Sequence, residues 1–229
     1  MKLLTESELI WSAVVANNRM NRKRKATGVN SYEKDLGFNP EAYLDNLLEQ
    51  GSEVSWLDLC CGEGNALLQY ASKVALNDQQ NAVKLTGVDL VDQFQTIPSF
   101  VHCLHFETQS LVAWSSDMQY DLITSVHGFH YVGDKLKALL VALKSIKEYG
   151  MLIANFDLDS IKIDNAESFR YFKKLFKENN IEYNVRKRLL VCKGPRYLDF
   201  RLTYRGADDT TGPNYTGQAA VDAYYSFIR

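Results

Sequence analysis

Trp56-Leu57-Asp58-Leu59-Cys60-Cys61-Gly62-Glu63-Gly64-Asn65 is the stretch that decides the fold. An apolar run over 54–60 predicts a buried strand, and the helical spacing of apolar residues over 65–74 predicts a helix directly after it. Two glycines, one residue apart, join the two elements. Glycine permits positive φ and lets a ligand approach the backbone, and the start of a helix offers unpaired N–H groups. The stretch therefore predicts a cofactor cradle at a strand-to-helix turn.

Asp89 is the second landmark, because it ends the run Thr86-Gly87-Val88 of a second predicted strand over 83–88. An acidic side chain at that place suits hydrogen bonding to ribose hydroxyls. A dinucleotide site would need a third glycine five residues after Gly62, but Leu67 stands there and is far too large. The spacing therefore disfavours a dinucleotide-dependent dehydrogenase.

The rest of the chain alternates between strand-like and helix-like segments, which predicts a parallel α/β sheet. Further strands are predicted over 101–106, 120–126 and 151–156, and helices over 6–17, 135–147 and 166–177. Asn39-Pro40-Glu41 is typical of a helix start, with Asn as the cap and Pro in the first turn. A loop is predicted over 27–32, and an antiparallel hairpin from 188–193 and 197–204.

Composition is that of one globular domain: 229 residues, 46% hydrophobic and 24% charged. No apolar run approaches the roughly 18 residues of a membrane span, and the first residues lack the features of a signal peptide. Cysteines 60, 61, 103 and 192 show neither a CxxC pair nor zinc spacing. We therefore expect reduced thiols, no metal, no membrane partner and a cytoplasmic location.

A basic segment stands apart in a chain whose net charge is −2. It holds Arg19, Arg22, Lys23, Arg24 and Lys25, so the remainder of the chain is acidic. Such a run is usually a solvated face or a mobile arm, and contact with nucleic acid is the alternative.

Counted from Asp58, the loop follows the pattern Asp-x-Gly-x-Gly-x-Gly with Cys60 in place of the first glycine. Together with Asp89, this resembles the class I S-adenosylmethionine-dependent methyltransferases over about residues 54–204. The resemblance implies a Rossmann-like α/β fold, with a seven-stranded, mostly parallel sheet in the order 3-2-1-4-5-7-6, the last strand antiparallel, and helices on both faces. It also implies a helical or lid segment over 1–50, a core over 51–205 and a tail over 206–229 packed on or near the core.

The same resemblance implies S-adenosyl-L-methionine as methyl donor and S-adenosyl-L-homocysteine as product. In that family the glycine loop wraps the methionine part, the first acidic residue organises the loop, and the acidic residue after the second strand holds the ribose. Residues after the third strand meet the adenine, and the end of the fourth borders the sulfonium. The residues implied at the cofactor are Asp58, Cys60, Gly62, Gly64, Asp89, Leu90, Glu107, Thr108 and Ser125. Cys60 is expected to keep a negative φ.

Two histidines after the fourth predicted strand are the candidate catalytic residues. Histidine accepts a proton near neutral pH, so either could act as a base. His127 ranks first because it lies closer to the strand end and the neighbouring Gly128 leaves room for a ligand. His130 precedes the aromatic Tyr131, a place where packing is sufficient reason for a histidine. The competing interpretation is that alignment alone suffices and neither is catalytic.

Residues 19–32 are predicted to form a lid that excludes water, with Arg19 and Tyr32 placed near a carboxylate of cofactor or substrate. The expected reaction is methyl transfer to an oxygen or nitrogen of a small molecule by in-line displacement, in a monomer or homodimer. Three alternatives stay open: an RNA or protein methyltransferase that uses the basic segment, a non-catalytic cofactor-binding protein, and aminopropyl transfer on the same fold.

Overall fold

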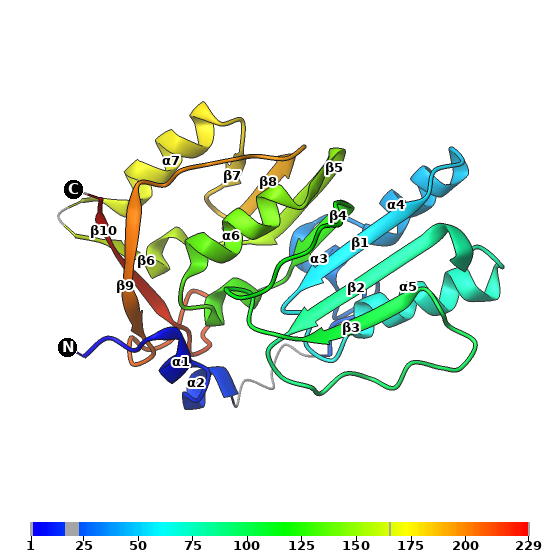
Figure 1. Ribbon diagram of the computed structural model, residues 1–229, viewed down its shortest axis with the longest axis horizontal. Helices are drawn as coiled ribbons and strands as arrows, with labels where there is room; N and C mark the ends of the chain where they lie inside the picture. Colours follow the sequence, from blue (N-terminus) through cyan, green and yellow to red (C-terminus); the bar gives the residue numbers. More distant parts are fainter. Residues whose placement is uncertain (1, 17–22, 165, 229) are drawn as a thin grey trace.

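The computed structural model describes residues 2–16, 23–164 and 166–228. Its centre is a seven-stranded sheet in the order β3-β2-β1-β4-β5-β8-β7 (Figure 1). The strands of this sheet are β1 (Val54–Leu59), β2 (Val83–Asp89), β3 (Leu104–Thr108), β4 (Tyr120–Ser125), β5 (Ile146–Asn155), β7 (Glu182–Asn184) and β8 (Leu189–Lys193). All six residues of β1 are buried, as a strand covered on both faces requires.

The strand order confirms the predicted topology. Strands β1 to β5 run parallel to one another, and β8 runs antiparallel to both β5 and β7. Six strands therefore share one direction and one opposes them. The last two strands count as 8 and 7 because an additional strand precedes them in the chain. The carboxyl ends of β1, β2 and β4 consequently meet at one edge of the sheet, where ligands of open α/β folds bind.

Helices cover both faces of the sheet, as predicted. One face packs against α3 (Tyr32–Leu36), α4 (Pro40–Glu49) and α5 (Asn65–Leu76), and the other against α6 (Lys135–Lys144) and α7 (Ser168–Glu178). Alternate residues of β1 serve the two cores: Trp56 belongs to the first and Leu57 to the second. The predicted start of α4 is confirmed, because the Asn39 side chain accepts a hydrogen bond from the N–H of Ala42 at 3.0 Å.

A second sheet of three strands contradicts the predicted terminal hairpin. It consists of β6 (Ile161–Ile163), β9 (Leu202–Asp208) and β10 (Asp222–Phe227) in the order β6-β10-β9. Strand β8 is buried between β5 and β7 and so has no free edge for residues 197–204. Strand β9 pairs instead with β10, which lies parallel to β6. The tail over 206–229 thus supplies a strand, β10.

Two helix boundaries also differ from prediction. The helix expected over 6–17 is divided into α1 (Glu6–Leu9) and α2 (Ala13–Ala16). The break is stabilised by Ser12, whose hydroxyl accepts a hydrogen bond from the N–H of Val15 at 3.2 Å and so begins a new helix. Helix α6 ends at Lys144 rather than at 147, because β5 already begins at Ile146.

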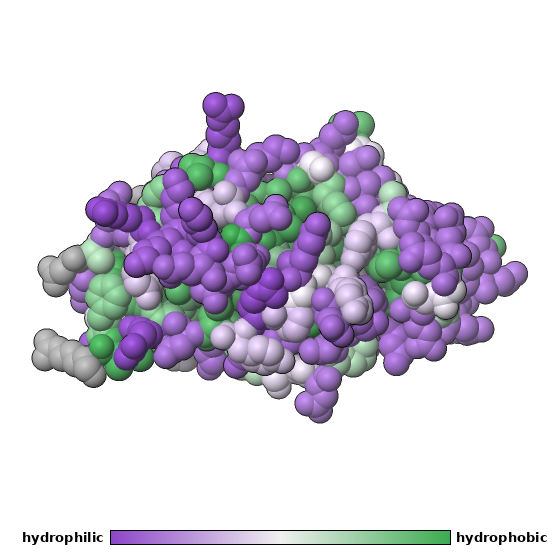
Figure 2. Space-filling view, turned by 90° about the horizontal axis from the view of Figure 1, so that it is seen from above, coloured by the Kyte–Doolittle hydropathy of each residue, from purple (hydrophilic) through white to green (hydrophobic). Residues whose placement is uncertain are grey.

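Short 3-10 turns complete the structure: η1 (Gln80–Ala82), η2 (Gly128–Tyr131) and η3 (Leu158–Ser160). Every described helix falls short of the length and apolarity that crossing a membrane demands. The face seen from above is mostly hydrophilic, with hydrophobic residues showing between hydrophilic ones toward its middle (Figure 2). Helices α1 and α2 lie at the opposite side, near the ends of β9 and β10 (Figure 1).

Candidate functional site

The glycine loop after β1 has the backbone that its sequence predicts. Gly62 has φ +62° and Gly64 has φ +74°, both in the left-handed region. Gly64 is also the N-cap of α5, and a Cβ there would lie 2.2 Å from the Phe106 ring. Only glycine meets both demands, so the turn brings backbone N–H groups of the loop and of α5 toward the edge of the sheet.

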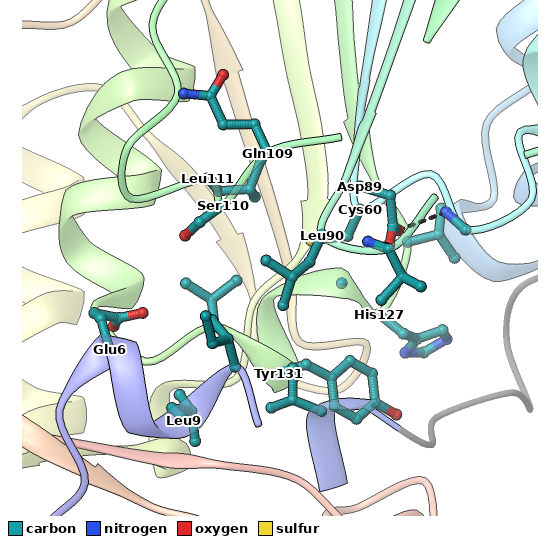
Figure 3. Close-up of a pocket in the computed structure, with 17 residues that line it drawn as sticks. Glu6, Leu9, Cys60, Asp89, Leu90, Gln109, Ser110, Leu111, His127 and Tyr131 are labelled. Carbon is teal, nitrogen blue, oxygen red and sulfur yellow. Dashed lines mark hydrogen bonds between the residues drawn. The ribbon is translucent and has the colours of Figure 1, made fainter. Parts of the chain in front are cut away.

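Asp89 connects this loop to the next one. Its carboxylate accepts a hydrogen bond from the N–H of Gly62 at 2.8 Å and another from the N–H of Val91 at 3.2 Å. The first of these contacts is drawn as a dashed line in Figure 3. The end of β2 therefore fixes the loop after β1, and the carboxylate stays at the wall of a cavity.

Cys60 departs from expectation, because its φ is +57° rather than negative. The cysteine takes a left-handed conformation that glycine adopts without a steric penalty, and for cysteine the cost is roughly 1–2 kcal/mol. Gly128 accommodates its side chain: a Cβ on Gly128 would lie 2.3 Å from the Cβ of Cys60 and 2.9 Å from its sulfur. The space beside Gly128 that we expected a ligand to use is therefore occupied by Cys60. Burial raises the pKa of the Cys60 thiol, which argues against a nucleophile.

The cavity at this edge holds about 820 Å³ of empty space, part of it open to solvent. Cys60, Asp89 and His127 lie on one side of it, and Glu6 and Leu9 on the other (Figure 3). Its wall consists of Glu6, Leu9, Ile10, Val15, Cys60, Gly62, Asp89, Leu90, Val91, Gln109, Ser110, Leu111, Val126, His127, Gly128, Tyr131 and Val132. Of the predicted cofactor residues, the structure brings Cys60, Gly62, Asp89 and Leu90 together here.

Asp58 lies below the cavity rather than in its wall. Its carboxylate accepts hydrogen bonds from the hydroxyls of Tyr32 and Thr124, each at 2.6 Å, and it is fully buried. Burial raises the pKa of Asp58 to about 7, against the opposing effect of these two hydrogen bonds. Tyr32, expected in a loop at the substrate, is the first residue of α3 and is also buried. Tyr32 and Asp58 therefore lie in the core next to the glycine loop and do not face the cavity.

Four other predicted residues lie outside the cavity wall, namely Gly64, Glu107, Thr108 and Ser125. The carboxylate of Glu107 accepts a hydrogen bond from the indole N–H of Trp114 at 2.9 Å. Thr108 is exposed, and Ser125 is buried with a hydroxyl that has no hydrogen-bond partner among the described residues. The segment just after β3, Gln109 to Leu111, lines the cavity in place of Glu107 and Thr108.

His127 lines the cavity and has φ +58°, a conformation rare for residues other than glycine. Its backbone N–H donates to the side-chain oxygen of Asn155 at 3.3 Å, and its Nε2 lies 3.8 Å from Asp35 Oδ1. Its Nδ1 lies 3.4 Å from Nε2 of His130. His130 is 1% exposed, and burial lowers its pKa well below the usual value, so its ring is neutral. The catalytic role of either histidine stays a prediction.

Helices α1 and α2 cover the cavity, with Glu6, Leu9, Ile10 and Val15 in its wall. The predicted lid began later, and Arg19 lies outside the described residues. The described part of that segment packs elsewhere: the N–H of Ala26 donates to the Gln69 side chain at 3.0 Å, and Arg24 forms an ion pair with Asp35.

Sequence reasoning missed two charged residues, Glu6 and Lys135. Glu6 accepts a hydrogen bond from the backbone N–H of Asp134, which ties α1 to the loop before α6. Lys135 is buried and donates to the carbonyls of Phe129 and Val132 at 2.9 and 2.8 Å, so it holds the η2 turn. Burial lowers the pKa of Lys135 to about 8. Nothing in the pattern distinguishes either residue from an exposed charge at a helix start.

Comparison with known proteins gives one family and a set of similar folds. Residues 32–185, more than half of the chain, match the profile of a family described as methyltransferase domain. None of the curated proteins matches the sequence. YjhP from E. coli is 17% identical, with a TM-score of 0.40, over 62% of this chain and 54% of that one.

Two further solved structures are similar. The N-methyltransferase NodS from Bradyrhizobium japonicum, in complex with S-adenosyl-L-homocysteine, is 14% identical, with a TM-score of 0.44, over 75% of this chain and 95% of that one. The plantazolicin methyltransferase BpumL, solved with a monoazolic desmethylPZN analogue and S-adenosyl-L-homocysteine, is 24% identical, with a TM-score of 0.39, over 52% and 45%. The chain thus spans about half the length of YjhP and of BpumL. The family match and the strand order together identify the chain as a member of the methyltransferase domain family with the class I, S-adenosylmethionine-dependent type of fold.

Proposed function

We propose that the chain transfers a methyl group from S-adenosyl-L-methionine to an oxygen or nitrogen of a small molecule, releasing S-adenosyl-L-homocysteine. One observation carries the proposal: the glycine loop, the Asp89 carboxylate and the end of β4 border a single cavity that α1 and α2 cover. The wall of this cavity is mostly apolar with a few polar side chains, which is usual for ligand sites.

The residues of the cavity fit the proposed cofactor. Backbone groups of the loop from Cys60 to Gly64 would hold the methionine part, and the Asp89 carboxylate would accept hydrogen bonds from the ribose hydroxyls. Leu90 and Leu111 offer apolar surface to the adenine. The Glu107 carboxylate accepts from Trp114 through Oε2, and a contact of this carboxylate with the adenine stays a prediction.

The bound cofactor supplies a methyl group already activated by its sulfonium. The task of the chain is therefore to align a nucleophile in line with that group and to exclude water. The apolar residues Leu9, Ile10 and Val15 of the α1–α2 cover would exclude water. His127, at the end of β4, would orient the acceptor or take its proton where the nucleophile arrives protonated.

A small acceptor is favoured over RNA by the state of the basic segment. Arg24 is engaged in an ion pair with Asp35, and Lys23 and Lys25 border a separate hollow with Gly28 and Gln69. Arg24 is thus already paired with a carboxylate of the chain itself, and the chain outside the basic segment is acidic, which disfavours contact with phosphates. The four cysteines are free thiols, which supports our proposal of a cytoplasmic location. A monomer or homodimer, and the three-part division at residues 50 and 205, stay part of the proposal.

Two experiments test the function. Calorimetry with S-adenosyl-L-methionine and S-adenosyl-L-homocysteine should show binding of both, and lack of heat at high cofactor concentration would refute the proposal. Mass spectrometry of cell extract incubated with labelled methyl donor should then identify a methylated small molecule. Labelled RNA or protein, or tight binding without turnover on any extract, would favour the alternatives of a macromolecular substrate or a non-catalytic protein.

The role of His127 needs its own test once an acceptor is known. His127→Asn should lower turnover roughly 10²–10⁴-fold if the ring is a base, with cofactor affinity intact. A loss below tenfold, or an unchanged pH–rate profile, would leave alignment as the sole contribution of this loop.

A further inference from the structure

Helix α3 contacts a residue at each of the two loops that border the cavity: Asp58, just before the loop after β1, and His127, in the loop after β4. From its first residue, the Tyr32 hydroxyl donates to Asp58 Oδ2 at 2.6 Å. The other oxygen of Asp58 accepts from Thr124 of β4, whose hydroxyl in turn accepts from the indole N–H of Trp56 at 2.8 Å. The Tyr32 ring packs edge-on against Trp56, with centroids 6.3 Å apart. Tyr32 thus closes a buried polar cluster two residues before Cys60.

One helical turn later, Asp35 faces the other loop. Its Oδ1 lies 3.8 Å from Nε2 of His127, and its Oδ2 pairs with Arg24. Burial alone would raise the pKa of Asp35, but His127 and Arg24 outweigh burial and lower it. The carboxylate is therefore ionised at neutral pH and favours a proton on the Nε2 that faces it.

The helix between these two side chains is fixed at both ends. The Ser31 side chain accepts a hydrogen bond from the N–H of Lys34 at 3.4 Å, and Gly37 ends the helix with φ +65°. Leu36 is 2% exposed and anchors the helix in the core below the sheet. Because Tyr32 and Asp35 are three residues apart on this helix, their side chains lie on neighbouring positions of one face.

We propose that α3 is a positioning element that joins the two halves of the cavity: Tyr32 sets the loop after β1 through Asp58, and Asp35 sets the ring of His127 in the loop after β4. The inference rests on the proposed function, in which the first loop holds the methyl donor and the second faces the acceptor. Both residues are positioning residues, since neither lines the cavity. Fixing the two loops from one short helix fixes the distance between them, on which the rate of a displacement depends steeply.

Three variants test the two parts of this proposal, which we call the Tyr32 arm (Tyr32 to Asp58) and the Asp35 arm (Asp35 to His127). Tyr32→Phe keeps the ring packed on Trp56 and removes only the donor to Asp58. Asp35→Asn keeps the shape and removes the charge that faces His127, and Asp35→Glu restores that charge. Lys34→Gln, an exposed position between them on the same helix, is the control.

Calorimetry with S-adenosyl-L-homocysteine reads the first arm. We expect the Kd to rise about tenfold in Tyr32→Phe, because a hydrogen bond to a carboxylate is lost, and to change less than twofold in Asp35→Asn and Lys34→Gln. The ¹⁵N chemical shifts of the His127 ring read the second arm. We expect the Nε2–H tautomer in the wild type, a mixed population in Asp35→Asn, and recovery in Asp35→Glu.

The outcomes separate the inference from the function on which it rests. Failure of the wild type to bind the cofactor product overturns the proposed function, and the His127 shifts, which need no cofactor, still test the Asp35 arm. Binding by the wild type with an unchanged Kd in Tyr32→Phe overturns the Tyr32 arm. Identical His127 shifts in the wild type and Asp35→Asn overturn the Asp35 arm. Thermal unfolding of each variant verifies that the measurements report folded protein.

Discussion

The loop after β1 and the loop after β4 border one cavity but are held in different ways. The first is shaped mainly by its own glycines: Gly62 and Gly64 both have positive φ, and the N–H of Gly62 donates to the side chain of Asp89 at the end of β2. The second is fixed by side chains of distant segments, since His127 meets Asp35 of α3 and Asn155 of β5. A site half built from local geometry and half from long-range contacts should respond differently to substitution in each half.

The largest effect is expected from Gly64→Ala in the first loop. The new Cβ would face the Phe106 ring at 2.2 Å in a left-handed backbone, so strain and overpacking add up to about 2–5 kcal/mol of lost stability. Gly217→Ala is the matched control, because it also has positive φ but nothing within 4 Å. Urea unfolding compares them. Equal losses in the two variants would mean that close packing at Gly64 contributes nothing.

Asp58 predicts a pH dependence of stability that sharpens the comparison, because this residue lies under both loops. Burial raises its folded pKa from 3.8 to about 7. A raised pKa contributes stability that is fully present below about pH 4 and is lost as the pH rises through 7. The loss amounts to about 4 kcal/mol, because each pKa unit of difference between the folded and unfolded states corresponds to about 1.4 kcal/mol.

Asp58→Asn, which does not titrate, should remove most of this slope. Unfolding of the cofactor-free protein measured between pH 4 and pH 8 checks it. Parallel curves for the wild type and Asp58→Asn would exclude Asp58 as the source of the dependence.

Asp89→Ala should weaken cofactor binding without a comparable effect on the loop after β4. The carboxylate holds Gly62 and is proposed to hold the ribose, so a loss of about 1.5–3 kcal/mol, or roughly tenfold to a hundredfold in Kd, is expected. Asp92→Ala, an exposed acidic neighbour, should leave the Kd unchanged. Wild-type affinity for S-adenosyl-L-homocysteine in Asp89→Ala would remove this residue from the site.

The smallest effect concerns a close contact between the two loops, Cys60 against Gly128. Gly128→Ala should destabilise the protein because its Cβ would lie 2.3 Å from the Cβ of Cys60. Cys60→Gly should relieve backbone strain and make room for that methyl group. The double variant is therefore expected to recover about 1 kcal/mol relative to additivity, measured by a double-mutant cycle. Additive losses would show that the two loops are energetically independent.

The part of the molecule that followed from the sequence is the part governed by local rules. Strand periodicity predicted the strands of the central sheet, the Asn39 cap predicted the start of α4, and the two glycines predicted the turn at Gly64, because each depends on neighbours in the chain. The order of the strands came from the resemblance to the methyltransferase family and not from these local rules. The hairpin prediction was wrong because it assumed that two strands close in the chain pair with each other. Both edges of β8 are already paired, with β5 and with β7, so β9 pairs with β10 in a separate sheet.

The side chains of the cavity were harder to predict for a related reason. Glu107 has the expected acidic character, but Trp114, seven residues later, takes its carboxylate. Tyr32 was expected at the substrate because it lies in a loop-like, cationic segment that precedes the first strand. Its ring is instead suited to the core, and only its hydroxyl needed a partner. Glu6 and Lys135 were missed because their roles depend on contacts that spacing does not reveal. Glu6 accepts from the N–H of Asp134, and Lys135 donates to the carbonyl of Phe129.

The three-stranded sheet has a consequence for how acceptor choice can change. Leu4 exchanges two backbone hydrogen bonds with Ala207 of β9, each at 2.8 Å, and Val221 beside β10 donates to the carbonyl of His130 at 2.9 Å. Helix α1, which covers the cavity, and the η2 turn after β4 are thus both hydrogen-bonded to segments of the three-stranded sheet or beside it. Substitutions in β9 or β10 can therefore change the shape of the proposed acceptor side of the cavity. They leave the glycine loop and Asp89, which are proposed to hold the methyl donor, unchanged.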